Sequence, residues 1–246
     1  NDPANRFLRE STAFAVAARQ TLPAPRRDHA LVAASVGCYG AHLGDGSEYT
    51  GTYGVSKAAI EEWHDRKLGV QLASGADLMA FETIPCIDEC RALCSLISRH
   101  DQDKMMNGWL TFACKSHEHL TSGEGLEDAL RTVLDQPEDL SCKSLDYLGL
   151  GINCTDPNYI TELLEIASSV LGSKSSHPIV VYPNKGETWN EVTRKWENNS
   201  GASDVHFANQ AAGEWFDRGA RLLGGCCRTT PTTIEKLAAA LASKVE

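Results

Sequence analysis

The chain has 246 residues, of which 42% are hydrophobic and 23% charged, as is typical of a globular protein with one large or two ordinary domains. Its formal net charge of -10 argues against a surface for nucleic acid or anionic membranes, because binding to phosphate groups needs a basic surface. No apolar run approaches the roughly 20 residues of a membrane-spanning helix. We therefore expect small molecules as partners, and neither nucleic acid nor membranes.

Cysteine usage indicates a reducing compartment. The chain contains nine cysteines, an odd number, and its first residues show no pattern of a secretory leader. Reduced thiols in the cytoplasm are therefore expected, and thiols that cluster favour metal binding or catalysis over disulfides.

Hydrophobic periodicity predicts helices and strands that alternate along the chain. In chain order, we expect a helix at 5–20, a strand at 30–37, a loop at 38–54, a helix at 56–74, a strand at 76–85, a helix at 87–99, a strand at 106–114 and a helix at 125–135. A strand at 146–154, a helix at 157–171, a strand at 177–184, a loop at 185–204, a helix at 205–218, a strand at 221–223 and a helix at 231–245 follow. Pro23 and Pro25 are expected to end the first helix.

This alternation predicts a parallel sheet with right-handed crossovers, built from six βα units after a leading helix. A doubly wound sheet would normally carry a glycine-rich phosphate turn after an early strand, and no G-x-G-x-x-G lies at such a junction. The (β/α)8 barrel places active-site residues at the carboxyl ends of its strands, where Glu82, Cys154, Asn184, Cys226 and Cys227 fall. We therefore predict a TIM-type barrel in one domain, 1–246, with two units absent in front of residue 1.

Three of the cysteines are candidates for a metal site. Cys154 ends one predicted strand, and Cys226 and Cys227 follow another, so the three would converge on one face of a barrel. Zinc takes thiolates tetrahedrally, and a catalytic zinc typically has three protein ligands and an open position. Burial as small hydrophobes is the alternative, and a redox pair is weaker because a disulfide between neighbours is strained. The other six cysteines are interpreted as packing: Cys38, Cys86, Cys90, Cys94, Cys114 and Cys142.

Polar residues near the strand ends allow two interpretations each. Glu82 either recognises a substrate amine at the mouth of the barrel or is a solvated strand terminus. Asn153 and Asn184 either contact substrate or satisfy backbone groups of loops. A solvated lid is expected from loop residues His42, Asp45, Glu48 and Tyr49.

Five motifs carry a resemblance to a known family. GAHLGDGSEYTGTYG, AFETIP, GINC, VVYPNKGE and GGCCRTTP occur in this order over residues 35–231. Together they resemble the homocysteine S-methyltransferase family, in particular the branch that uses S-methylmethionine or S-adenosylmethionine. The resemblance implies a (β/α) barrel with zinc held by Cys154, Cys226 and Cys227, and it implies that Glu82 holds the amino group of homocysteine. Asn153 is assigned as a second substrate-binding residue.

The resemblance also implies a reaction, zinc-dependent methyl transfer from the sulfonium donor to the thiol of L-homocysteine, giving methionine. Family members begin with a strand ending in Asp-Gly-Gly and a second strand ending in a Ser/Thr- and Tyr-rich segment, and neither is in these residues. A non-catalytic zinc-binding remnant therefore remains the alternative, and a thiol-dependent barrel enzyme without metal is a third. The loop at 185–204 is a candidate lid, in which Trp189 and Trp196 can hold a sulfonium by cation–π contact.

Overall fold

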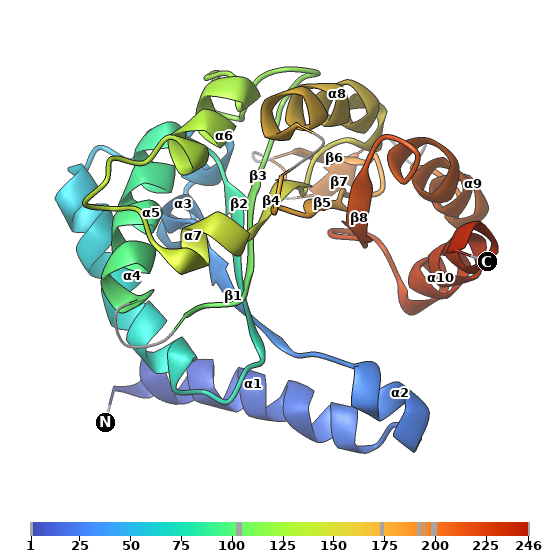
Figure 1. Ribbon diagram of the computed structural model, residues 1–246, viewed down its shortest axis with the longest axis horizontal. Coiled ribbons are helices and arrows are strands. Elements are labelled where there is room, and N and C mark those ends of the chain that lie inside the picture. The colour runs from blue at the N-terminus through green and yellow to red at the C-terminus, as the bar shows by residue number, and fades with distance from the viewer. Residues whose placement is uncertain are drawn as a thin grey trace.

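The computed structural model describes residues 2–101, 105–172, 175–190, 193, 195–197 and 201–245. One six-stranded parallel sheet has the order β1-β2-β3-β4-β5-β8, and helices surround its curved arc of strands (Figure 1). Its strands are β1 (Ala33–Gly37), β2 (Leu78–Ile84), β3 (Gly108–Phe112), β4 (Gly149–Asn153), β5 (Ile179–Tyr182) and β8 (Ala220–Leu223). The predicted α/β fold with six βα units after a leading helix is confirmed.

The long helices lie where the periodicity predicts them. They are α1 (Pro3–Gln20), α4 (Lys57–Leu72), α5 (Ile87–Asp101), α6 (Leu126–Leu134), α8 (Ile160–Leu171) and α10 (Pro231–Val245), and the shorter α9 (Asp204–Gln210) covers the first half of the helix predicted at 205–218. Their starts follow from capping, because side chains of Asp2, Ser56 and Ser203 accept hydrogen bonds from backbone N–H groups of the first turns of α1, α4 and α9. Among the described residues, no helix is both long and apolar enough to cross a membrane.

The core lies between the strands and the helices. Strand β4 is buried along its whole length, as expected for a central strand of a parallel sheet. Helix α5 buries Cys90 and Cys94 completely, and Cys86 is buried just before it. The interpretation of these three cysteines as a packing stripe is confirmed.

Short elements differ from the prediction. The structure adds α2 (Ala24–His29), α3 (Tyr39–Leu43), a 3-10 turn (Ser47–Tyr49), α7 (Lys143–Tyr147) and the antiparallel hairpin of β6 (Thr188–Asn190) and β7 (Lys195–Glu197). The two predicted loops at 38–54 and 185–204 are therefore partly ordered into helical turns and a hairpin. Elements of three to six residues are too short for a reliable hydrophobic period. Proline is also tolerated in a first helical turn, so Pro25 follows the end of α1 and lies in the first turn of α2.

The predicted helix at 205–218 changes its hydrogen-bonding pattern midway. Helix α9 ends at Gln210, and residues Ala211–Trp215 form a π-helical turn in which the N–H of Phe216 donates to the carbonyl of Ala211 at 3.0 Å. Trp215 is fully buried and its ring lies edge-on to Phe207, with 5.4 Å between centroids. The wider turn thus accompanies the burial of a large aromatic side chain.

Candidate active site

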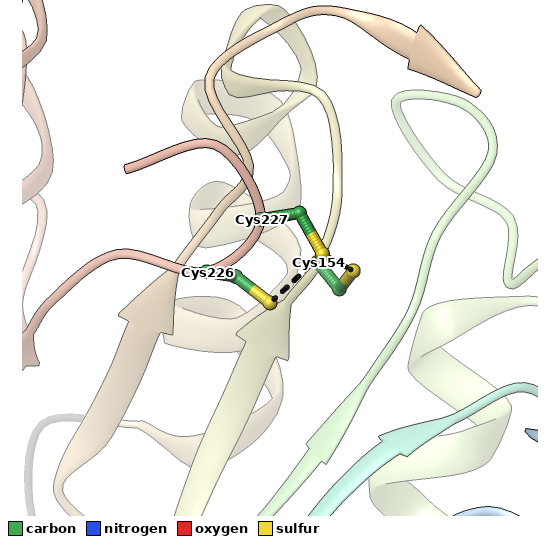
Figure 2. Close-up of side chains that lie close together, drawn as sticks. All are labelled: Cys154, Cys226 and Cys227. Carbon is green, nitrogen blue, oxygen red and sulfur yellow. Dashed lines mark hydrogen bonds between the residues drawn. The ribbon is translucent and has the colours of Figure 1, made fainter. Parts of the chain in front are cut away.

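The three predicted metal-ligating cysteines lie together in the structure (Figure 2). Cys154 follows β4 directly, and Cys226 and Cys227 lie on the loop after β8. The Sγ atom of Cys227 is 3.7 Å from that of Cys154 and 3.9 Å from that of Cys226. All three sulfurs lie within 4.8 Å of one another, and all three residues are only partly buried. A ligand can therefore reach the cluster from solvent.

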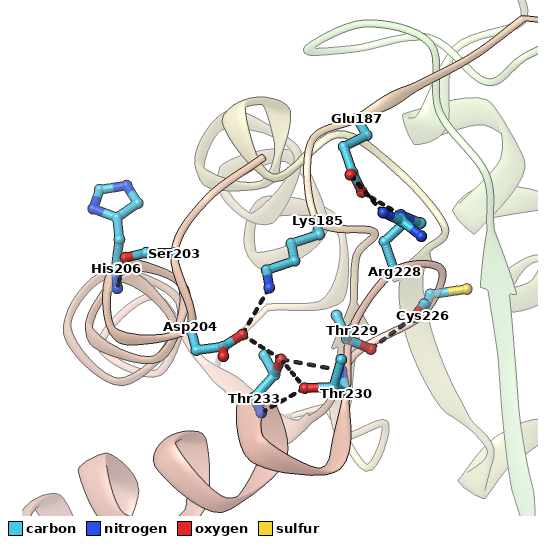
Figure 3. Close-up of polar contacts among 10 residues, drawn as sticks. All are labelled: Lys185, Glu187, Ser203, Asp204, His206, Cys226, Arg228, Thr229, Thr230 and Thr233. Atoms are coloured by element: carbon cyan, nitrogen blue, oxygen red, sulfur yellow. Dashed lines mark hydrogen bonds and ion pairs between the residues drawn. The ribbon is translucent and has the colours of Figure 1, made fainter. Parts of the chain in front are cut away.

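Backbone hydrogen bonds beyond the strand ends position these sulfurs. The N–H of Cys154 donates to the carbonyl of Tyr182 at 3.2 Å, and the N–H of Cys226 donates to the carbonyl of Pro183 at 2.9 Å. Both cysteine loops are thereby attached to the segment that continues β5. The hydroxyl of Thr229 donates to the carbonyl of Cys226 at 2.6 Å (Figure 3). A Cβ atom on Gly225 would lie 2.5 Å from that hydroxyl, so the close turn requires glycine there.

The backbone around the cluster is strained. Thr83, Cys154 and Arg228 have φ values of 62°, 49° and 69°, and these are the positive values among described residues other than glycine. Left-handed backbone is unfavourable for side chains with a Cβ atom, and it persists where the surrounding structure holds it. Thr83 is the last residue but one of β2, Cys154 follows β4 directly, and Arg228 lies on the loop after β8. Strain is thus concentrated where the candidate site is built.

The donor set and its spacing fit a thiophilic metal ion. Zinc lies about 2.3 Å from a thiolate sulfur, so two tetrahedral sulfur ligands are separated by about 3.8 Å. The separations of 3.7 and 3.9 Å agree with this value. Hydrogen bonds from the thiols of Cys154 and Cys226 lower the pKa of Cys227, and hydrogen bonds shared with Cys226 and Cys227 raise the pKa of Cys154. The cluster thus stabilises a thiolate before any ion binds.

Glu82 lies within β2, not at its end as predicted. A register shift between Phe81 and Ile84 accompanies the left-handed Thr83, and this bulge lets the strand continue for two residues beyond Glu82. One carboxylate oxygen of Glu82 accepts a hydrogen bond from the hydroxyl of Ser35, and the other accepts one from the hydroxyl of Tyr182 at 2.9 Å. Glu82 is half-buried, so lone pairs of its carboxylate remain available to a ligand.

Asn153 is buried, with 1% of its surface exposed, and bridges three strands. Its Oδ1 atom accepts hydrogen bonds from the N–H of Thr83 at 2.7 Å and from the hydroxyl of Thr111 at 2.9 Å, and its Nδ2 atom donates to Thr83 Oγ1 at 2.8 Å. These contacts agree with satisfaction of backbone groups, and the assignment of Asn153 to substrate stays a prediction. Asn184 likewise accepts from the N–H of Gly186 at 2.8 Å.

The segment from 185 to 204 is attached to the cysteine loop (Figure 3). Lys185 and Asp204 form an ion pair of 2.8 Å across the ends of the segment, which lowers the pKa of Asp204. Glu187 accepts two hydrogen bonds from Arg228, at 2.8 and 3.1 Å, and Arg228 directly follows Cys227. The side chains of Trp189 and Trp196 lie outside what the structure describes, so their predicted contact with a sulfonium stays a prediction.

Residues that the sequence analysis did not select complete the site. Tyr182 and Thr111 lie between Glu82 and Asn153, Trp109 donates a hydrogen bond to Tyr182, and Arg228 anchors the segment after β5. Tyr182 stands in the motif VVYPN, two residues before the selected Asn184. Alternate residues of a strand face the same side, so the choice of Asn184 in the predicted strand at 177–184 could also have indicated Tyr182.

Strain at Arg228 can be tested with two substitutions that both remove its ion pair. We expect Arg228→Gly to unfold about 3 °C above Arg228→Ala, because only alanine has a Cβ atom that disfavours the left-handed backbone. Thermal unfolding followed by circular dichroism measures the difference. In the control pair Arg131→Gly and Arg131→Ala, in α6, the order should invert because glycine destabilises helices. An Arg228→Ala variant as stable as Arg228→Gly would contradict the strain argument.

Fold and site together define a protein of the (β/α)-barrel type with a three-thiol site that can hold a metal ion. The model of the homocysteine S-methyltransferase family matches residues 1–241. The chain therefore belongs to this family.

Similar proteins agree with this assignment. Homocysteine S-methyltransferase 3 of Arabidopsis thaliana is 41% identical over 242 residues, which cover 98% of this chain and 64% of that protein. The chain thus spans less than two thirds of this relative's length. The oxidized form of the homocysteine methyltransferase MmuM from Escherichia coli has a TM-score of 0.77 and 33% identity, covering 96% of this chain and 70% of that chain. Its metallated form has a TM-score of 0.75, with the same identity and coverage.

Proposed function

We propose that this protein transfers a methyl group from a sulfonium donor, S-methylmethionine or S-adenosylmethionine, to the thiol of L-homocysteine, giving methionine. Residues 1–246 would form one homocysteine-binding domain. The observation that carries the proposal is the cluster of Cys154, Cys226 and Cys227 beyond the carboxyl ends of β4 and β8, the two strands that flank β5, where barrel enzymes place their active sites. The name of the Arabidopsis relative supports homocysteine as acceptor, and the metallated E. coli structure supports a metal.

The three cysteines would hold the ion, and zinc is the metal proposed from their soft sulfur donors and spacing. Bound zinc would lower the pKa of a substrate thiol, which is otherwise near 8.5 and largely protonated at neutral pH. Three protein ligands leave a fourth tetrahedral position for that thiol.

The remaining residues would bind and orient the acceptor. Glu82 would accept hydrogen bonds from the ammonium group of homocysteine, since its carboxylate is fixed by two hydroxyl groups and the residue is only partly buried. Methyl transfer forms a carbon–sulfur bond on the acceptor and breaks one in the donor, which leaves as a neutral thioether. The leaving group therefore needs no proton from a general acid. The proposal places the protein in the cytoplasm, where its nine free cysteines would stay reduced.

The proposal is tested by an assay of methionine formation. Zinc-loaded protein is incubated with homocysteine and S-methylmethionine, S-adenosylmethionine or betaine, and product is measured by mass spectrometry. We expect product with at least one sulfonium donor and none after chelation of the metal. Product with betaine alone would contradict the sulfonium donor. Zinc binding without product from any donor would support the non-catalytic remnant.

A further inference from the structure

We propose that Tyr182 is a positioning residue that holds the Glu82 carboxylate in place for the ammonium group of the thiol substrate. Tyr182 would thereby make the site selective for thiols that carry an α-amino group. The inference rests on the proposed function, because it takes Glu82 as the group that binds the substrate amine.

The contact between Tyr182 and Glu82 crosses the inner side of the sheet. Glu82 lies on β2 and Tyr182 on β5, with β3 and β4 between them. In a flat sheet, three strand spacings would separate the two backbones by about 14 Å. The curved sheet instead brings the Tyr182 hydroxyl within 2.9 Å of Glu82 Oε2. Ser35 of β1 donates to Oε1, so the carboxylate is held from two sides.

Other side chains fix the hydroxyl of Tyr182. The indole N–H of Trp109 donates to it at 2.8 Å, and Thr111 Oγ1 lies 2.8 Å from it. Burial, followed by the nearby Glu82 charge, raises the pKa of Tyr182, so the hydroxyl stays protonated and donates to the carboxylate. A hydroxyl that is held by the indole N–H of Trp109 can fix the carboxylate more firmly than a mobile hydroxyl can.

Tyr182 also connects the amine-binding group with the cysteine cluster. Its carbonyl accepts the hydrogen bond from the N–H of Cys154 at 3.2 Å, while its hydroxyl binds Glu82. One residue therefore sets the positions of both groups. A substrate whose thiol and ammonium must reach the two groups together depends on this spacing, whereas a thiol without the amine does not.

The test compares two thiols on zinc-loaded protein. Dissociation constants of homocysteine and of 4-mercaptobutyrate, which lacks the amino group, are measured by calorimetry for the unmodified protein, Tyr182→Phe and the exposed control Tyr147→Phe. We expect Tyr182→Phe to bind homocysteine about tenfold more weakly, the size of a lost hydrogen bond to a charged group, with 4-mercaptobutyrate and zinc content unchanged. Tyr147→Phe should match the unmodified protein for both thiols.

A second measurement separates action through Glu82 from a general structural effect. If Tyr182 acts through Glu82, adding Tyr182→Phe to Glu82→Gln should weaken homocysteine binding no further. Equal weakening for both thiols, additive losses in the double variant, or no loss at all would each overturn the role of Tyr182. Unmodified protein that binds zinc but no homocysteine would overturn the proposed function, and the inference with it.

Discussion

Replacing Cys226 with serine is expected to reduce the zinc content of the purified protein from about one ion per chain to nearly none. Serine keeps the size of the side chain but has no readily ionised thiol, and thiolates are the ligands that the three-sulfur cluster offers. Elemental analysis of protein dialysed against metal-free buffer measures the content. The catalytic assay should lose its product in the same variant.

The matched control is Cys142→Ser. Cys142 is also free and only partly buried, but it precedes α7 and is not a member of the cluster. This variant should keep its zinc. Full zinc retention in Cys226→Ser would remove Cys226 from the ligand set, and equal loss in both variants would point to a general loss of folding.

Replacing Glu89 with alanine is expected to destabilise the protein by about 3 to 5 kcal/mol, because it removes one partner of a buried, hydrogen-bonded pair. Glu89 and His64 are both fully buried, and Glu89 Oε1 lies 2.7 Å from His64 Nε2. The same oxygen accepts from the N–H of Tyr39 at 2.6 Å, and the other oxygen accepts from the hydroxyl of Tyr53. The variant would leave these donors without a partner in the interior.

These contacts hold the segment after β1 in place. Tyr39 and Tyr53 lie near the two ends of the predicted lid at 38–54, and Glu89 ties both to α5. Urea denaturation measures the loss of stability. Asp88→Ala, one residue earlier and exposed, is the control and should cost at most about 1 kcal/mol. A Glu89→Ala variant as stable as Asp88→Ala would contradict the structural role of the buried pair.

The fold and the cysteine cluster could both be predicted from the sequence, and for the same reason. Parallel strands carry their carboxyl ends on one edge of a sheet, so residues that follow a strand share that edge whatever the distance between them in the chain. Cys154 and the pair Cys226 and Cys227 satisfy this rule, and the structure brings their sulfurs within 4.8 Å. The rule does not require knowledge of the sheet's curvature, because β4, β5 and β8 are neighbours in the sheet.

The bulge at Thr83 could not be predicted from the sequence. The predicted strand at 76–85 was expected to be regular with Glu82 at its carboxyl end, whereas β2 contains a left-handed residue at Thr83 and ends at Ile84. Threonine is not a residue whose type predicts positive φ, so no local pattern indicated it. The conformation is held by Asn153, which lies 70 positions further along the chain and binds both the N–H and the hydroxyl of Thr83.

The sequence by itself determined the order of the six sheet strands and of the helices between them, the edge on which the candidate ligands lie, and the family to which the chain belongs. Only the tertiary structure decided that Tyr182 reaches Glu82 across two intervening strands and that Glu89 meets His64 in the core. The physical reason is that hydrophobic periodicity is a local property of the chain, whereas these contacts join distant segments. Periodicity reports the direction of each side chain relative to its own backbone, whereas contacts across the sheet depend on its curvature, which accumulates over several strands.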